Sequence, residues 1–553
     1  MKDKRLFVTS VQQKQQPKSN GGGGRWFWAP VALITMVAGA LAFSSAAGET
    51  QTWDEGIHIS AGYAYLTRGD YRWNQEHPPL AKLMCALPLT FLRLNLPLSG
   101  SAWKKLDETQ MGIQFLYQNR ISPDIILFAA RAINMLLFLL FIAALAWWVR
   151  RRFGPAAALL TAALCAFDPN LIAHARYVTT DFPVTVFYFF AAALWIDYLR
   201  TARLRDLAFA ALLFAVAMIT KFSAVLLIPT FAFLYAIRWI HAPPEFPVRR
   251  AAVAVSILAG TTFLAVAIIY WPETIRWIKG SAQQHAFFTG LNKVISHNQE
   301  GHPSFLLGMR SDQGWWCYFP VVFGVKSTVA ALAATILVAA TALWWAIRNR
   351  AKLVFQWWAL LVPPIIYFLI SMTSAINIGM RHILPVYPFL YVAAAALLAE
   401  VLPARAARYA MLALAALQIG ECASIAPDYL AFFNGLSGGP GNGPHYLVDS
   451  NIDWGQDVKK LARWLQAHGT RSAFIAYFGN AQLPLYGLET KSFPNPLDEH
   501  GWDALDGYAV AGVTPLNGVY VPLDSLARLR LRQPIAKIGW SMYVYDFRKR
   551  ATP

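Results

Sequence analysis

Two neighbouring carboxylates and a nearby proline-rich turn hold the side chains of this chain that are best suited to chemistry. Asp54 and Glu55 stand together, and His77 opens a His-Pro-Pro-Leu-Ala-Lys sequence that ends at Lys82. A positioned carboxylate can remove a proton from an attacking hydroxyl. A lysine or histidine can stabilise negative charge that develops on a leaving group. The spacing therefore predicts an acid/base group beside a cationic site.

The composition shows what surrounds these residues. Of 553 residues, 56% are hydrophobic and 14% are charged, which excludes an ordinary soluble domain. An α-helix needs about 20 apolar residues to cross a bilayer. We therefore predict a polytopic α-helical membrane protein with about eleven spans, at 27–47, 124–148, 155–173, 182–199, 206–220, 222–240, 251–270, 326–346, 353–372, 383–402 and 407–425.

Loop charges predict the orientation, because lysines and arginines near span ends stay on the cytoplasmic side. Every second loop is basic, as in Arg150–Arg152, Arg200–Arg205 and Arg405–Arg408. We expect a flexible cytoplasmic tail over 1–26, a transmembrane catalytic domain over 27–425 with outer loops at 48–123 and 271–325, and an extracytoplasmic domain over 426–553. The net charge of +18 follows largely from this topology, so no nucleic-acid partner is expected.

The first outer loop mixes aromatic, apolar and charged residues. The segment 57–66 has the composition of an amphipathic helix that lies in the membrane interface. A second such helix is expected over 80–87, because proline is tolerated in the first helical turn. These two helices would hold Asp54 near the depth of the lipid headgroups.

Three short outer turns each carry a basic residue against the charge rule. They supply Arg176, Lys221 and Arg381. A specific anionic partner explains such residues, and a side chain that reaches for a lipid headgroup is the competing interpretation. Together with Lys82, they could converge on one phosphate, which arginine and lysine bind through charge-assisted hydrogen bonds.

The order of these motifs resembles a known family. Asp54-Glu55, then the 77–82 motif, then Arg176 to Asp181, then Thr220-Lys221-Phe222-Ser223 are similar to the GT-C glycosyltransferases, and within them to the protein O-mannosyltransferase and aminoarabinose transferase group. The blocks 314–320, 377–385 and 449–457 resemble uncharacterised bacterial members of that group. The resemblance covers residues 50–480.

The resemblance implies transfer of a sugar from a polyprenyl-phosphate-linked donor to a protein or envelope-glycolipid hydroxyl. The reaction would take place at the outer face of a bacterial inner membrane, among membrane lipids and without cofactor or metal. Asp54 would be the general base and Glu55 would orient the acceptor or a loop, although an exchange of these roles stays open. The competing interpretation is that both acids cap the helix that begins near Gly56.

The cations would stabilise the phosphate that leaves. Lys82, Arg176, Lys221 and Arg381 are the candidates. His77 would either donate to the same phosphate or bond to backbone in the proline turn. Asp181 would either hold Arg176 or Lys221 in place or cap a helix.

Two regions beyond these motifs carry further candidates. In the outer segment 271–325, His302 is the candidate for substrate contact, with a water-exposed loop histidine as the alternative. The tail predicts a small α/β domain with strands at 472–478 and 518–521 and a helix at 458–465. Asp449, Asn451, Asp453 and Asp457 are spaced as in a calcium loop, but Trp454 and Lys460 replace the glycine and glutamate that such a loop needs.

Two other classes of protein fit the composition. A transporter or lipid flippase also places cations within a membrane, but the polar residues gather at span ends and no inverted repeat is visible. A non-catalytic assembly protein would use the tail for partners. The sequence identifies neither the sugar nor the acceptor.

Overall fold

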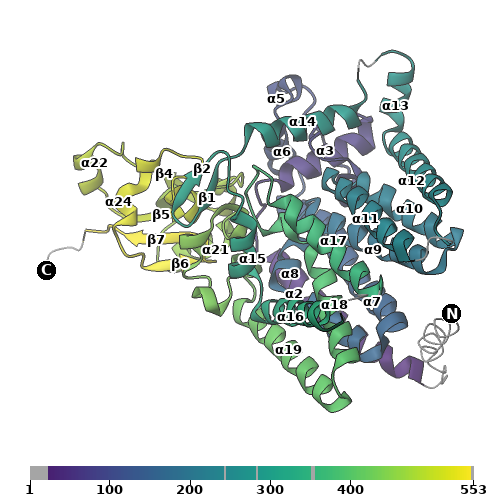
Figure 1. Ribbon diagram of the computed structural model, residues 1–553. Coiled ribbons are helices and arrows are strands. Elements are labelled where there is room, and N and C mark those ends of the chain that lie inside the picture. Colours follow the sequence, from purple (N-terminus) through teal and green to yellow (C-terminus); the bar gives the residue numbers. More distant parts are fainter. Residues whose placement is uncertain (1–22, 242–244, 282–283, 350–354, 550–553) are drawn as a thin grey trace, which may run out of the picture.

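The computed structural model describes residues 23–241, 245–281, 284–349 and 355–549, which form a large helical part with a small sheet at one end (Figure 1). The tail predicted over 1–26 lies outside these residues except at its end, where helix α2 (Gly23–Ala47) begins. The basic residues Arg350 and Lys352 also lie outside them.

The helical part contains several long apolar helices. Within the described ranges, five are long and apolar enough to cross a membrane: Trp26–Ala47 in α2, α7 (Pro123–Ala166), α9 (Asp181–Thr201), Phe222–Ile240 and α12 (Val248–Ile269). A sixth is present if α15 (Tyr318–Lys326) and the following helix α16 (Val329–Asn349), bent by 117°, count as one span. The chain is therefore a multi-pass integral membrane protein.

The other expected spans coincide with shorter or less apolar helices. These are α8 (Pro169–Ala175), α10 (Leu204–Met218), α17 (Phe355–Ser371), α18 (Val386–Val401) and α19 (Ala404–Ile425), whereas α11 (Leu227–His241) forms most of the fourth span above. Helix α7 joins two predicted spans across a break at Gly154, where φ is 86°. Every residue of α18 from Val386 to Leu398 is buried. Its apolar residues thus pack against protein, which a hydropathy count cannot distinguish from contact with lipid.

The segment 48–123 folds over one end of the spans. It contains α3 (Glu55–Arg68), α4 (Leu80–Ala86), the 3₁₀ helix η1 (Leu87–Leu92), α5 (Ser101–Lys105) and α6 (Glu108–Tyr117). The prediction of an interfacial helix over 57–66 is wrong, because residues 58–65 of α3 are all buried. Helix α4 begins directly after the two prolines, as expected. It packs so closely on α3 that a side chain at Gly62 would collide with the carbonyl of Lys82.

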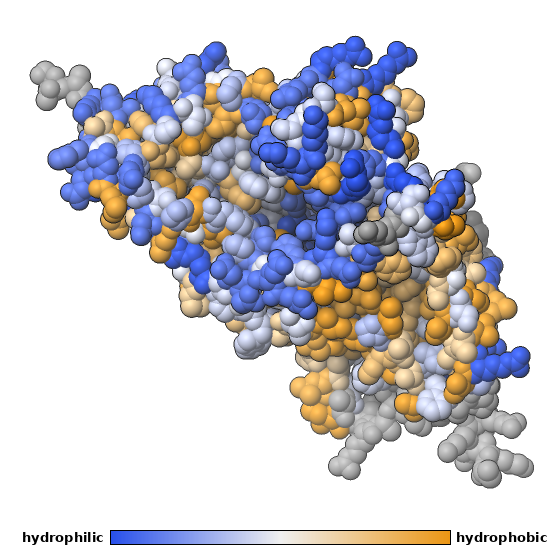
Figure 2. All heavy atoms as spheres, turned by 90° about the horizontal axis from the view of Figure 1, so that it is seen from above, coloured by the Kyte–Doolittle hydropathy of each residue, from blue (hydrophilic) through white to orange (hydrophobic). Residues whose placement is uncertain are grey.

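The segment 271–325 covers the same end of the spans. It contains α13 (Trp271–Ile278), α14 (Ala286–Glu300), a hairpin of β1 (Ser304–Leu306) and β2 (Met309–Ser311), and the start of α15. Seen from above, hydrophilic residues surround a hollow in this face, and hydrophobic residues gather on the helical part beside it (Figure 2).

The C-terminal segment forms a mixed five-stranded sheet of order β4-β3-β5-β7-β6. Strands β3 (Ser472–Ala476), β4 (Glu489–Lys491) and β5 (Tyr508–Gly512) are parallel, whereas β7 (Met542–Asp546) runs antiparallel to both β5 and β6 (Ala536–Ile538). The strand at 472–478 and the helix at 458–465 are confirmed, the latter as α21 (Val458–Ala467). The strand at 518–521 is wrong: a turn follows α23 (Val513–Leu516) there, and Tyr520 has a φ of 63° that a strand does not allow.

Short elements connect the helical part to this sheet. Trp454 and Phe478 belong to the same apolar core as the long helices. Two backbone hydrogen bonds join the segment before Asp54 to this region, from Thr50 N to Gln456 O at 2.9 Å and from Trp53 N to Trp454 O at 3.0 Å. The other elements are η2 (Phe222–Leu226), η3 (Met380–Ile383), η4 (Tyr429–Ala431), η5 (Gly435–Ser437), α20 (Gly443–Tyr446), η6 (Asp449–Asn451), η7 (Leu483–Tyr486), α22 (Glu499–Asp503), η8 (Leu523–Leu526) and α24 (Ala527–Arg530).

Candidate active site

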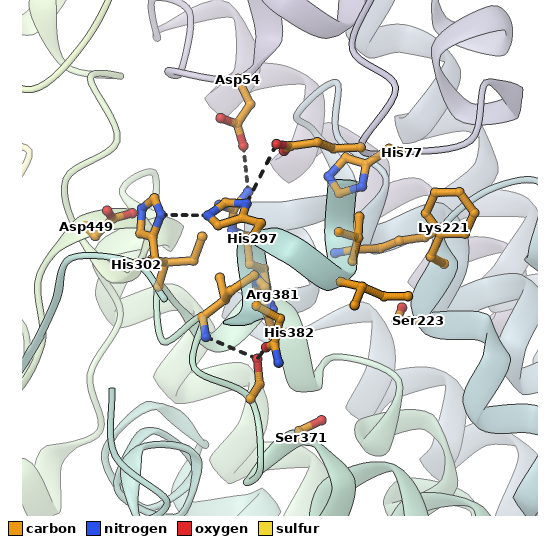
Figure 3. A pocket seen from close by; sticks show the side chains of 18 of the residues that line it. Asp54, His77, Lys221, Ser223, His297, His302, Ser371, Arg381, His382 and Asp449 are labelled. Carbon is orange, nitrogen blue, oxygen red and sulfur yellow. Dashed lines mark hydrogen bonds and ion pairs between the residues drawn. The ribbon is translucent and has the colours of Figure 1, made fainter. Parts of the chain in front are cut away.

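A cavity of about 830 Å³ lies where the segments 48–123, 271–325 and 426–549 meet the ends of the spans (Figure 3). Five of the residues predicted from the sequence line it: Asp54, His77, Lys221, His302 and Arg381. The other four, Glu55, Lys82, Arg176 and Asp181, lie behind its surface. The structure thus divides the predicted set into side chains that face the cavity and side chains that support them.

Asp54 forms an ion pair with Arg381 in the lining of the cavity. Asp54 stands at the N-cap position of α3, but its side chain makes no capping hydrogen bond. Its Oδ2 accepts instead from Arg381 Nη1 at 2.7 Å, and a quarter of the Asp54 side chain is exposed. The capping interpretation therefore does not describe this carboxylate, which is held by a cation at the edge of open space.

Asp181 holds the two cations of the cavity together. It is the first residue of α9 and is buried. Its Oδ1 pairs with Lys221 Nζ, and its Oδ2 lies 3.8 Å from Arg381 Nη1. The Arg381 guanidinium also lies over the Trp454 ring, 4.3 Å from its centroid. Arg381 thus connects Asp54 to Asp181, and Lys221 completes the row of charges.

Two histidines face the same space as neutral rings. Burial, and then the charge of Lys221, hold the pKa of His77 and that of His382 well below the ordinary value. The His77 ring packs edge-on against His58, with centroids 5.7 Å apart. A neutral imidazole keeps one N–H donor, so both rings can bind an anion that enters the cavity.

Glu55 lies behind the cavity in a buried ion pair. Arg131 Nε and Nη2 donate to its two oxygens at 2.8 and 2.6 Å, and both side chains are almost fully buried. Burial alone would raise the pKa of Glu55, but the charge of Arg131 holds it below the ordinary value. Glu55 also accepts from Thr52 N and Val178 N. These bonds fix the chain on both sides of the cavity and leave Glu55 no access to it.

Arg176 is also buried in an ion pair, with Glu49. Tyr177 OH donates to the same carboxylate at 2.9 Å. Sequence reasoning missed both Glu49 and Arg131. A signal was available for Arg131, since a charge inside a predicted span requires a partner.

The Lys82 ammonium forms its hydrogen bonds with the turn that precedes α4. Its Nζ donates to Asn74 O at 2.5 Å, Asn74 Oδ1 at 3.1 Å and His77 O at 2.8 Å. Burial lowers the Lys82 pKa to about 7. The lysine thus shapes the His77 turn from below, in place of the predicted contact with a phosphate in the cavity.

Lys82→Met is therefore expected to weaken the fold more than donor binding. Carbonyls left without their donor cost about 1–3 kcal/mol, so the thermal unfolding temperature of the purified protein should fall. The affinity for a donor lipid should stay within about twofold, because the removed side chain lies outside the cavity. Lys293→Met, at an exposed lysine of α14, is the control. A large loss of donor affinity in folded Lys82→Met protein would contradict this assignment.

The His302 ring is held by hydrogen bonds at both nitrogens. Nδ1 lies 3.0 Å from His297 Nε2, and Nε2 lies 2.8 Å from Tyr520 OH. Burial lowers the pKa of His302 to about 4, assisted by the charges of His297 and Arg381. Direct contact of a substrate with either nitrogen would thus require one of these bonds to break.

The acidic residues that begin in η6 each have a different partner. Asp449 accepts from Tyr520, Asp453 from Thr514 N and Asp457 from Ser541. Within the described part of the chain, no three His, Cys, Asp or Glu side chains are grouped as metal ligands would be. The residues that could hold a charged ligand are instead the cations of the cavity.

The helical membrane fold and the cavity with an acid and two cations are typical of a membrane enzyme that binds an anionic substrate. Comparison with known proteins indicates which kind of enzyme this is. Residues 124–271 match the family model described as dolichyl-phosphate-mannose-protein mannosyltransferase. This match over part of the chain agrees with the resemblance found in the sequence motifs and indicates a membrane glycosyltransferase. The enzymatic interpretation is therefore preferred to the transporter and the assembly protein. No curated protein sequence gives a significant match.

Several solved structures are similar to the chain. ArnT from Cupriavidus metallidurans bound to undecaprenyl phosphate is 14% identical, with a TM-score of 0.47 over 93% of this chain and 97% of that chain. Its apo state is 16% identical, with the same TM-score and coverage. The oligosaccharyltransferase AglB from Archaeoglobus fulgidus, in complex with an inhibitory peptide and a dolichol-phosphate, is 10% identical, with a TM-score of 0.45 over 91% of this chain and 72% of that chain.

Proposed function

We propose that this protein transfers a sugar from a polyprenyl-phosphate-linked donor to a hydroxyl of a protein or envelope glycolipid, with Asp54 as the general base. The observation that carries the proposal is the placement of Asp54, Lys221 and Arg381 on one cavity. The name of the matching family supports a lipid-phosphate donor. The loop charges support a reaction at the periplasmic face of a bacterial inner membrane.

The cavity chemistry follows from these three residues. The acceptor hydroxyl gives its proton to Asp54 while its oxygen bonds to the anomeric carbon. The bond from that carbon to the phosphate oxygen breaks, and its electron pair leaves with the phosphate. Lys221 and Arg381, held together by Asp181, stabilise the negative charge. The neutral rings of His77 and His382 donate to the same group.

Transfer itself is the test. The purified protein in lipid nanodiscs is incubated with radiolabelled polyprenyl-phosphate sugars, in parallel with membrane lipid extract and with an envelope protein fraction. We expect the label to move to one of these two acceptor pools while free polyprenyl phosphate is released. Movement of labelled lipid across a vesicle bilayer without release would indicate a transporter. If the protein neither transfers nor moves any of the donors, the proposal is overturned.

A further inference from the structure

A chain of titratable side chains runs along one wall of the cavity and has no part in the chemistry above. Its members are Glu76, His297, His302, Tyr520 and Asp449, and all five line the cavity. They come from five separate segments: the turn before α4, helix α14, the loop after α14, the turn after α23 and η6. Because these segments are separate in the sequence, it is the fold that brings the five side chains together.

Three hydrogen bonds and one longer ion-pair contact connect the five members of this line. Glu76 Oε1 lies 3.7 Å from His297 Nδ1, and His297 Nε2 lies 3.0 Å from His302 Nδ1. His302 Nε2 lies 2.8 Å from Tyr520 OH, which donates to Asp449 Oδ2 at 2.6 Å. Figure 3 shows the two histidines joined in this line, with Asp449 beyond them. Each histidine uses one ring nitrogen on each side, and the Tyr520 hydroxyl contacts both of its neighbours, as transfer of a proton from group to group requires.

The two ends of the chain differ in exposure. The Glu76 side chain is 44% exposed, whereas Asp449 is buried. Burial raises the pKa of both carboxyls, that of Asp449 to about 6. A carboxyl whose pKa is raised holds a proton more readily than an ordinary one, so each end can take up and release a proton.

The buried end lines the same cavity as the proposed base. The charge of Arg381, which pairs with Asp54, lowers the pKa of Asp449, while the charge of Asp54 raises it. Asp54 therefore lies within electrostatic reach of Asp449 as well as of His302. The other charged neighbours of the chain are Asp312 near His302, and Glu108 and Lys293 near Glu76.

We propose that the line Asp449–Tyr520–His302–His297–Glu76 is a proton relay that carries the acceptor's proton from the neighbourhood of Asp54 to solvent. This inference rests on the proposed function. One proton leaves the acceptor hydroxyl in each turnover, and Asp54 must lose it before the next. Asp54 passes the proton through the open cavity to Asp449. Tyr520, His302 and His297 then each accept one proton and give up one, and Glu76 releases a proton to solvent.

A purely structural clamp between the segments is the rival explanation, and imidazole distinguishes the two. In His302→Ala, the turnover rate should fall by about 10- to 100-fold. This reduction is no larger than the one expected when a general base is removed. The KM for the donor should not change. Added imidazole should restore part of the rate with saturation, because it can pass a proton where the ring was. The exposed His500→Ala variant is the control and should show neither effect.

Tyr520→Phe gives a second, independent readout. The Tyr520 hydroxyl lowers the pKa of Asp449 through its hydrogen bond. Its loss should move that pKa above about 6, so the acidic limb of the pH–rate profile should shift to higher pH. A clamp role would change stability but would leave this limb in place.

These results separate the relay from the proposed function. If the wild-type protein transfers no sugar, the proposed function fails. If it does transfer sugar, the relay is overturned by His302→Ala and Tyr520→Phe proteins with wild-type rates and pH profiles. It is also overturned if both variants lose activity only in step with thermal unfolding and imidazole restores nothing. Saturable rescue together with the shifted limb supports it.

Discussion

Asp54→Asn is expected to reduce sugar transfer by about 10²- to 10⁴-fold, the contribution of a positioned general base. Asparagine has nearly the same size, and its amide oxygen can still accept from Arg381, which now donates to Asp54 Oδ2 at 2.7 Å. It cannot take up the acceptor's proton. Binding of the donor lipid should therefore persist while turnover is lost. Single-turnover transfer and equilibrium binding of a labelled donor measure the two quantities separately.

Asp503→Asn is the matched control for this variant, because Asp503 is an exposed acid of α22, away from the cavity lining. It should transfer sugar at the wild-type rate. Near-normal turnover by purified Asp54→Asn protein would remove Asp54 from the role of base. Glu55 would not replace it, since both Glu55 oxygens are bound by Arg131 away from the cavity.

The sequence predicted the cavity's charged residues better than their individual roles. Arg381 and Lys221 were expected beside Asp54 because they break the rule of loop charges, and both line the cavity. Arg176 meets the same criterion and Lys82 is predicted from its proline turn, yet Arg176 is buried against Glu49 and Lys82 among backbone carbonyls. A residue's type shows that a cation is present, but whether an acid or a ligand neutralises it depends on tertiary contacts. Sequence alone does not contain that information.

The sequence predicts the helical membrane fold and the small C-terminal domain, but the number of clear spans and the place of the helix over 57–66 differ from the prediction for a similar reason. Apolar runs marked the helices correctly, but helix α18, which is buried by its neighbours, has the same composition as one that faces lipid. The segment 57–66 has alternating small, aromatic and polar residues, which suit either an interface or a tight helix pair. Gly62 is what decides between them, because it allows α4 to approach. Such a contact joins two helices and cannot be read from one of them.

The second large effect concerns stability and lies in the Glu55–Arg131 pair. Arg131→Met is expected to lower the free energy of unfolding by about 3–5 kcal/mol, because it leaves Glu55 buried without a counter-charge. The double variant Glu55→Gln/Arg131→Met should recover part of this loss, since neither charge remains. Thermal unfolding in one detergent, for the wild-type protein and the two variants, measures the difference.

The pH dependence of unfolding is a second, independent test of the Glu55–Arg131 ion pair. The folded-state pKa of Glu55 is lowered, so its stabilising contribution is complete above the unfolded-state pKa and is lost as pH falls through the folded-state value. The double variant should lack this part of the acid sensitivity. Equal stability of the Arg131→Met and wild-type proteins at neutral pH would contradict the assignment. Because Glu55 directly follows Asp54, a destabilised pair should also displace the base, and transfer by Arg131→Met protein should fall even where the protein remains folded.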